Sequence, residues 1–342
     1  MKFAILVAVA LGIAAARSQK PFRAFPELRG SYVGQTLPGS KAALFAPGII
    51  STGMTERGVA LTRDGQEIFF ELSAGRVNTL LTSRLEDGRW TEPAVAPFAS
   101  DLKFYHYEPC LSADEKKILF LCTRPRAGEE PKPGWGHQNI WASDRSADGR
   151  WGEPYDLGDP INTADGEFYP SLTNDGTLYF TRSKGSAGAP RIMRSRLSGS
   201  RYLAPEILPA EVNGKGSPYN ACIAPDESFL IACVEGRSDS VAPMRSNYYV
   251  FFRSAEDRWS EGFNLGAEVN FPGASANAPY VTRDGRYLFF GSTRSRDFDP
   301  PSSVPMTSRR LLEYFMAPQN GNSDIYWIDA AFIQKLRPKD SK

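Results

Sequence analysis

Short apolar runs separated by polar turns recur along the whole chain, and each run is too short for a typical helix. Five of them lie directly after an Asp that is followed by Gly or Glu, and they share a content of Phe, Leu, Ile and Tyr. These runs are Ile68–Phe70, Ile118–Phe120, Leu178–Phe180, Phe229–Ile231 and Leu288–Phe290. Short runs of this composition, bounded by turn residues, predict β-strands.

The segment before each of these strands repeats as well, and it ends in the same turn. An Asp at such a turn accepts hydrogen bonds from the amides ahead of it, and a following Gly tolerates positive φ. The five turn residues are Asp64, Asp114, Asp175, Asp226 and Asp284. We therefore predict five hairpins, in which these carboxylates have a structural role.

A third strand and a second turn with an aromatic residue complete the repeat. Third strands are predicted at 139–143, 248–252 and 324–328, and the aromatic residues are Trp90, Trp151, Trp259 and the weaker equivalent Tyr202. A fourth strand then starts near a Pro or Gly, as an outer edge strand tolerates. Four strands in about 50 to 60 residues, repeated five times, predict an all-β, five-bladed β-propeller of four-stranded antiparallel blades. We expect the repeated aromatic residues to cap the seams between neighbouring blades.

The two ends of the repeat region complement each other. The fifth unit lacks its fourth strand, while residues 42–50 resemble one, so we expect the N-terminal strand to close the ring and remove an open edge. Deletion of residues 20–50 should then unfold the protein. The predicted propeller domain spans 41–336, with blades at about 54–98, 105–162, 166–212, 217–270 and 275–333.

The first 16 residues are typical of a signal peptide. Lys2 precedes an apolar run that is too short to span a bilayer, and Ala14-Ala15-Ala16 fits a cleavage site. We expect a periplasmic or extracellular protein with an N-terminal extension at 17–40 and a tail at 337–342. With 40 Lys and Arg against 39 Asp and Glu, we expect no nucleic-acid partner held by bulk charge. No other segment is long and apolar enough for a membrane helix, so we expect no membrane span, and we further expect a monomer.

The four cysteines form two similar pairs, Cys110 with Cys122 and Cys222 with Cys233. An even count in an exported chain invites a disulfide interpretation. A tight turn at Asp114 places Cys110 opposite about Leu119, however, so its pairing with Cys122 would exceed the roughly 7 Å Cα separation that a disulfide allows. Buried free thiols are the favoured prediction, and no cofactor is expected.

Two of the repeats carry a family resemblance. Residues 168–182 (FYPSLTNDGTLYFTR) and 278–294 (APYVTRDGRYLFFGSTR) resemble the WD-like repeat of TolB-type propellers, with 322–327 as the usual third strand. The resemblance covers roughly residues 40–335 and implies the fold rather than a function. Members of this type usually have six or more blades, so five is a departure. Similar repeats occur in periplasmic interaction proteins, in propellers fused to peptidases and in a few polysaccharide-cleaving enzymes.

The loops between blades, and those between second and third strands, meet on one face of a propeller, here called the long-loop face. The second-to-third loops are long in blade 2 (124–137) and blade 5 (294–322), and residues 308–315 of the latter predict a short helix packed over that face. Polar and aromatic residues at the strand entries and exits should gather there: Arg57, His106, Tyr107, Glu108, Glu167, Tyr169, Tyr219, Asn220, Asn277, Arg124, Arg182 and Arg294.

This residue set suits a polar ligand, and we interpret the chain as an exported binding protein for a protein, peptide or glycan. Simple pairing of Glu with Arg around a solvated channel mouth is an alternative. A second hypothesis is a carbohydrate-active enzyme, because five-bladed propellers with three channel carboxylates are similar to inverting furanosidases. That resemblance implies Glu108 and Glu167 as the acid–base pair with Glu56 assisting, at a separation of about 6.5–9.5 Å.

Two features weaken the enzyme hypothesis. Those enzymes usually have an Asp where this chain has Glu56-Arg57, and the two histidines lie outside any nucleophile motif. A general base at His106 beside Glu108 is a further alternative. An arginine paired with each of Glu108 and Glu167 would argue for binding rather than catalysis. Glu108, Glu167 and Asn220 offer oxygen atoms to a cation, but nothing enforces a ligand geometry, so no metal site is predicted.

Overall fold

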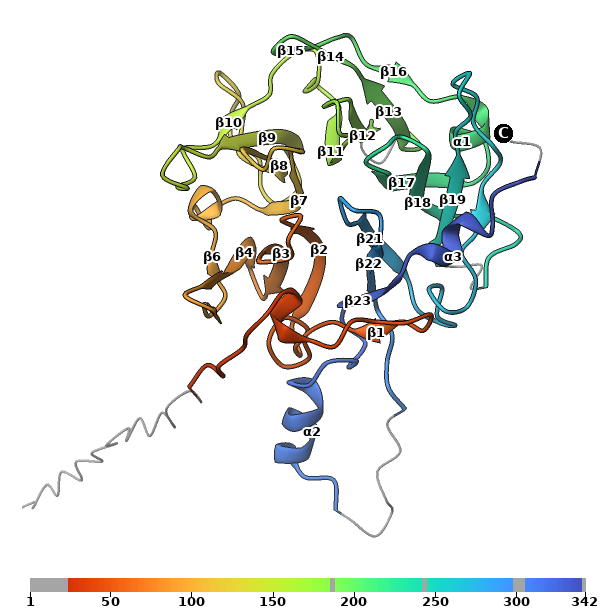
Figure 1. Cartoon of the computed structure of the whole chain (residues 1–342). Coiled ribbons are helices and arrows are strands. Elements are labelled where there is room, and N and C mark those ends of the chain that lie inside the picture. The colour runs from red at the N-terminus through yellow and green to blue at the C-terminus, as the bar shows by residue number, and fades with distance from the viewer. Residues whose placement is uncertain (1–23, 185–187, 242–244, 298–304, 340–342) are drawn as a thin grey trace, which may run out of the picture.

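Five four-stranded antiparallel sheets are arranged in a ring around a central channel (Figure 1). This computed structural model describes residues 24–184, 188–241, 245–297 and 305–339. The predicted five-bladed propeller is confirmed. The predicted signal peptide, residues 1–16, lies outside the described residues. Within the described ranges, no helix is both long and apolar enough to cross a membrane.

The strands follow the blades in chain order, from the channel outward. The four strands of blade 1 are β2 (Thr55–Leu61), β3 (Glu67–Ala74), β4 (Val77–Glu86) and β6 (Ala94–Val95), and the short β5 (Arg89–Trp90) forms a hairpin with the end of β4. Blade 2 contains β7 (His106–Leu111), β8 (Lys117–Cys122), β9 (Asn139–Asp144) and β10 (Tyr155–Asp156). Blade 3 contains β11 (Gly166–Leu172), β12 (Leu178–Ser183), β13 (Arg191–Ser195) and β16 (Glu206–Ile207), with an added hairpin of β14 (Leu197–Ser198) and β15 (Arg201–Tyr202).

Blade 4 contains β17 (Ser217–Ile223), β18 (Phe229–Glu235), β19 (Asn247–Phe252) and β20 (Phe263–Asn264). Blade 5 contains β21 (Ala276–Val281), β22 (Tyr287–Ser292), β23 (Asp324–Asp329) and, from the other end of the chain, β1 (Ala43–Leu44). The helices are α1 (Ala210–Asn213), α2 (Ser308–Phe315) and α3 (Ala331–Gln334), and the 3₁₀ turns are η1 (Tyr32–Gly34) and η2 (Pro97–Ala99).

The N-terminal strand closes the ring, as predicted. Ala43 pairs with Trp327, so β1 forms the outer strand of blade 5. The next residue after β1, Phe45, is fully buried, and its ring lies 5.0 Å from Phe289 and 5.1 Å from Trp327. The closing strand is therefore held by core packing as well as by the sheet.

All five predicted Asp turns form, on the face opposite the long loops, here called the turn face. In each turn the Asp Oδ1 accepts the backbone N–H two residues ahead at 3.0–3.2 Å. The following residue has positive φ, including the non-glycine residues Glu115 and Glu227. Five repeated carboxylates are thereby assigned to backbone turns.

The repeated tryptophans lie at the seams between blades, which confirms that prediction. The Trp151 ring of blade 2 lies 5.7 Å from Phe69 and 5.6 Å from Phe98, both of blade 1. Trp259 of blade 4 lies 6.3 Å from Tyr179 of blade 3. Each indole packs against the preceding blade and covers the apolar edge that two twisted sheets leave between them.

The four cysteines are buried free thiols, as favoured by the sequence. Cys110 pairs in register with Leu119, and Cys122 pairs with His106, so the two thiols of one blade are out of register. Burial raises the pKa of Cys110 to about 11. These thiols therefore act as small apolar side chains.

Helix α2 forms over the predicted residues, but its predicted location is wrong. It lies outside the ring of blades instead of over the face (Figure 1), and none of its side chains is buried. Asn320 donates to the carbonyls of Gly53 and Phe315, so the end of the helix is fixed beside a glycine at the rim. A Cβ at Gly53 would lie 2.2 Å from the Phe315 carbonyl, and this close contact requires glycine.

Candidate ligand-binding site

Every innermost strand carries a β-bulge near the long-loop face. At each bulge one residue has a φ between 42° and 60°, and the register with the second strand shifts there. The bulge residues are Gly58, Glu108, Tyr169, Asn220 and Ala278. Non-glycine residues adopt this conformation at a cost of about 1 kcal/mol or more, so other contacts must hold it in place.

Polar side chains from the preceding blade supply such contacts by accepting backbone N–H groups at or next to the bulge. Glu71 accepts from the Glu108 amide at 2.8 Å, and Glu108 in turn accepts from the Tyr169 amide at 2.6 Å. Two further hydrogen bonds of this kind are present. The Asn220 amide donates to the Thr181 hydroxyl at 3.1 Å, and the Asn277 amide donates to the Tyr248 hydroxyl at 2.8 Å. Successive blades are thus joined one to the next around the channel.

Arg57 occupies the centre of this arrangement. Its Nε lies 2.5 Å from Glu71 Oε2, and its Nη2 lies 3.5 Å from Glu108 Oε1. Its guanidinium carbon also lies 4.9 Å from the centre of the Tyr107 ring. Both carboxylates are almost fully buried, and this burial raises the pKa of each, against the opposing effect of Arg57. One cation therefore balances two buried carboxyl groups.

An exposed tryptophan stacks beside this pair. Trp135, in the long loop of blade 2, lies 5.1 Å from Tyr107 at an interplanar angle of 27° and is met edge-on by Tyr105 at 5.2 Å. It remains 47% exposed. The Tyr107 hydroxyl is within 2.7 Å of Ser73 Oγ and donates to Asn78, which fixes the ring beneath the indole. Arg57, Tyr107, Tyr105 and Trp135 are called the aromatic cluster below.

The loop that presents Trp135 is anchored by a histidine. His137 is buried, its Nδ1 lies 3.3 Å from Glu129, and its Nε2 contacts the Glu130 carbonyl at 2.8 Å. Sequence reasoning identified this loop as long but missed Trp135. The flanking Gly134 and Gly136 were the available signal, because glycines have no side chains that could cover an aromatic ring in a polar loop.

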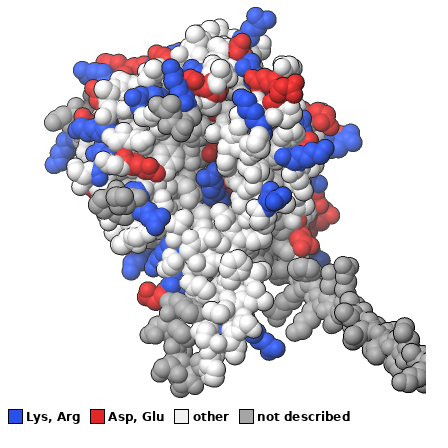
Figure 2. Space-filling view, turned by 180° about the vertical axis from the view of Figure 1, so that it is seen from behind, with Lys and Arg blue, Asp and Glu red and all other residues white. Residues whose placement is uncertain are grey.

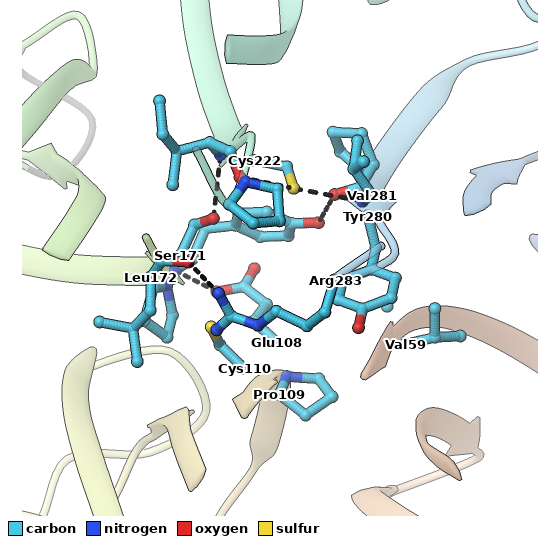
Figure 3. Close-up of a pocket in the computed structure, with 16 residues that line it drawn as sticks. Val59, Glu108, Pro109, Cys110, Ser171, Leu172, Cys222, Tyr280, Val281 and Arg283 are labelled. Atoms are coloured by element: carbon cyan, nitrogen blue, oxygen red, sulfur yellow. Dashed lines mark hydrogen bonds between the residues drawn. The ribbon is translucent and has the colours of Figure 1, made fainter. Parts of the chain in front are cut away.

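The other end of the channel is filled. Arg283 reaches across it, donating to the Leu172 carbonyl at 2.7 Å and to the Leu111 carbonyl (Figure 3). Tyr280 bonds the backbone of Leu61 at 3.2 Å. The remaining cavity, between Glu108 and Arg283, measures about 20 Å³, which is room for one water molecule. The cavity beside Glu108 at this end therefore has no room for a ligand larger than a water molecule.

The other two predicted carboxylates, Glu56 and Glu167, form hydrogen bonds with residues of their own blades rather than with Glu108. Glu56 is fully buried and accepts from the Thr52 amide at 3.1 Å, and burial raises its pKa to about 7. Glu167 is also fully buried; it accepts from the Thr163 hydroxyl at 2.6 Å and from Arg182 Nε at 2.8 Å. Burial raises the Glu167 pKa as well, ahead of the opposing hydrogen bonds.

His106 and two of the predicted arginines point toward the blade bodies. Both His106 nitrogens are buried without a hydrogen-bond partner in the described structure, and burial lowers the pKa of this residue to about 4. Arg124 lies over Trp141 at 5.3 Å, and Arg294 lies over Phe271 at 4.6 Å. In a strand, successive side chains alternate in direction, which separates His106 from its neighbour Tyr107.

The remaining candidates line the inner strands. The Tyr169 hydroxyl donates to the Pro279 carbonyl at 2.8 Å, across the channel. Tyr219 is half-buried, with its hydroxyl 3.5 Å from Glu235. The Asn220 side-chain oxygen is buried and unpaired within the described residues, and the Asn277 amide group donates to Ser323 at 3.1 Å.

The structure therefore brings Arg57, Tyr107 and Glu108 into contact and separates them from Glu56, His106 and Arg124. Glu71, which sequence reasoning also missed, supplies the strongest contact to Arg57. On the face shown in Figure 2, acidic and basic groups are interspersed, and basic groups are visible near its centre. In the described parts of the chain, no group of three or more His, Cys, Asp and Glu residues is placed to hold a metal ion.

Comparison with known proteins gives structural similarity alone. No family model and no curated protein matches the sequence. TolB from Acinetobacter baumannii is similar over 80% of this chain and 57% of its own length, at 14% identity and a TM-score of 0.45. The gluconolactonase XC5397 from Xanthomonas campestris is similar over 89% and 87% of the two chains, at 14% identity and 0.45. A putative exo-β-1,3-galactanase from Bifidobacterium bifidum covers 84% and 92%, at 13% identity and 0.43.

Proposed function

We propose that this chain is an exported, non-catalytic binding propeller that recognises a protein or peptide through the aromatic cluster on its long-loop face. The observation that most supports this proposal is the half-exposed Trp135, which stacks on Tyr107 beside Arg57. Trp, Tyr and Arg are the residues that dominate binding energy at protein interfaces, especially when they are held rigid. Glu108 and Tyr219 are proposed as further contacts at the channel mouth.

The buried carboxylates support binding over hydrolysis. Glu108 accepts from the Tyr169 amide and lies beside Arg57, and Glu167 is paired with Arg182. A general acid must be free to reach the leaving group, and these oxygens are engaged by the fold. Beyond Glu108, the channel has room for one water molecule rather than a sugar ring.

The alternative is a glycoside hydrolase, and the raised pKa of Glu108 is the observation that favours it. The variant Glu108→Gln separates the two functions, because it preserves shape and most hydrogen bonding. Loss of sugar release from a polysaccharide in this variant would establish the enzyme. Retention of partner binding by a stable Glu108→Gln protein is the result expected here.

Site-specific photo-crosslinking tests the proposed face. A benzophenone amino acid at position 135 should label one discrete protein in an envelope extract, and the same group at the exposed Ile207 on blade 3 should not. Excess wild-type protein should compete for that label, and Trp135→Ala should not. Equal labelling at both positions, or full competition by Trp135→Ala, would contradict the proposal. Binding to a glycan array that depends on Trp135 would replace the protein partner with a glycan.

Export is part of the proposal and rests on residues 1–16. Mass spectrometry of the protein recovered from its native host should find a mature N-terminus at Arg17. A mature chain that retains Met1 and the apolar run would contradict it.

A further inference from the structure

The seam between blades 2 and 3 differs from its neighbours at three repeat positions. At the outer hairpin, blades 2 and 4 pair an arginine with a tryptophan, Arg145 with Trp151 and Arg253 with Trp259. Blade 3 pairs Leu197 with Tyr202 at the same positions. The smaller ring and the missing guanidinium both leave space in this seam.

The third difference lies on the facing blade. In the seam between blades 1 and 2, Arg145 forms an ion pair with Glu67, the residue that starts the second strand of blade 1. The corresponding residue of blade 2 is Lys117, which pairs within its own blade with Asp144. Neither member of the Arg145–Glu67 pair therefore has a counterpart where blade 2 meets blade 3.

The result is an open cleft. Its volume is about 1000 Å³, whereas the space at the equivalent seam between blades 1 and 2 measures about 300 Å³. Ligand pockets for small molecules lie at about 300–1,000 Å³ and combine an apolar floor with a few polar groups. This cleft opens on the turn face, away from the aromatic cluster.

The lining of the cleft indicates the class of ligand. Tyr202, Leu157 and Leu172 contribute to an apolar floor that continues into the core of blades 2 and 3. Tyr155 is 38% exposed, and its hydroxyl donates to Asp144 at 3.1 Å while Lys117 lies 5.0 Å from its ring centre. Four acidic and three basic residues line the cleft, so its charges nearly cancel: Asp114, Asp144, Asp159 and Asp175, and Lys116, Lys117 and Arg201.

We propose that this cleft binds a short neutral saccharide. A sugar ring has an apolar face that stacks on aromatic side chains and hydroxyl edges that both donate and accept hydrogen bonds. Tyr155 and Tyr202 offer the rings, and Lys117 and Asp144 offer a donor and an acceptor. An anionic ligand would face Asp144, and a cationic one would face Lys117, so charge balance favours a neutral molecule.

Closure of the cleft is the direct test. Tyr202→Trp restores the residue found at the sealed seams, and Lys117→Glu with Leu197→Arg restores the ion pair. The probes are cellotriose, chitotriose and maltotriose, titrated separately by calorimetry and by saturation-transfer NMR. At least one should bind the wild type, and its affinity should fall at least tenfold in both closed variants. Tyr202→Phe keeps the ring and is the matched control, with affinity within about threefold of wild type.

Two comparisons separate this site from the aromatic cluster and from misfolding. Trp135→Ala should leave saccharide affinity unchanged, and the closed variants should unfold at the same temperature as wild type or higher. Absence of binding for all three trisaccharides would overturn the proposal. Binding that survives in both closed variants, or that is lost in Trp135→Ala, would also overturn it, because the ligand would then occupy another site.

Discussion

Two arginines stand at opposite ends of the channel, and their partners differ in kind. At the turn face, Arg283 donates to main-chain carbonyls of blades 2 and 3. At the long-loop face, Arg57 pairs with the buried carboxylates of Glu71 and Glu108. Carbonyl acceptors are neutral at every pH, whereas carboxylates gain or lose charge. One end is therefore a fixed structural plug, and the other is an electrostatically balanced group beside an open surface.

Arg57→Met should cause a large loss of folding stability that depends on pH. It leaves two buried carboxyl groups without a counter-ion, which destabilises proteins by about 3–5 kcal/mol. Because protonation relieves the charge, the loss should be greater at pH 9 than at pH 6. Urea unfolding at both pH values measures it. A loss below about 1 kcal/mol at pH 9 would mean that solvent, rather than Arg57, balances Glu71 and Glu108.

Arg283→Met should have an effect on stability that is independent of pH. Two carbonyls lose a charged donor, and hydrogen bonds to charged groups contribute about 1.5–3 kcal/mol. The same unfolding experiment at pH 6 and pH 9 should give equal losses. A loss that changes with pH would mean that the two ends of the channel do not differ as described.

Glu56→Gln tests the titration of the long-loop end directly. The Glu56 pKa is raised from 4.5 to about 7 by burial, so the folded state keeps a proton that the unfolded state releases. This contribution to stability is complete below pH 4.5 and is lost as pH rises toward 7. The variant should reduce that pH-dependent loss of stability by on the order of 3 kcal/mol, since each pKa unit corresponds to about 1.4 kcal/mol.

His106 makes the opposite contribution to the pH dependence of stability, so the Glu56→Gln experiment needs the wild type as its control at every pH. Its pKa is lowered from 6.5 to about 4, so its contribution is present above pH 6.5 and is lost as pH falls toward 4. The informative quantity is therefore the difference between variant and wild type at each pH. A difference that stays constant from pH 5 to pH 8 would show that Glu56 does not titrate in this range.

Trp135→Ala should have the smallest effect on stability. The side chain is 47% exposed and packs against the rings of Tyr105 and Tyr107, so we expect a loss of about 1 kcal/mol or less by thermal unfolding. Partner crosslinking should nevertheless be lost. A large loss of stability would instead mean that Trp135 has a structural role in shielding Tyr107 from solvent.

The repeat pattern was sufficient to predict the propeller, because each level of local structure agreed with the next. The Asp turns, the seam tryptophans, the closing strand and the out-of-register thiols all follow from spacing and turn chemistry. Helix α2 was also predicted from its sequence. Its location outside the ring was not predicted, because that location depends on Gly53, a residue about 255 positions away in the sequence. The need for glycine there is visible only in three dimensions, where the Phe315 carbonyl leaves no room for a side chain.

The candidate site was only partly predictable. The sequence located Arg57, Tyr107 and Glu108 at the strand entries, but a bulge determines which of three successive residues faces the channel. Glu71 lies in an ordinary second strand and is distinguished by its contacts with Arg57 and with the Glu108 amide, which become visible only in three dimensions. Trp135 lies in a loop whose length and sequence are not repeated in the other blades, so comparison of the repeats could not identify it.

The closing strand also sets the order of events during folding. Residue 43 pairs with residue 327, so β1 finds its partner only after all the other described strands have been made. Non-local pairings of this kind slow folding, because the entropy of closing a very long loop must be overcome before the contact forms. Until then blade 5 has an exposed edge. The ring thus remains open, with this edge free to pair wrongly, until its last blade is complete.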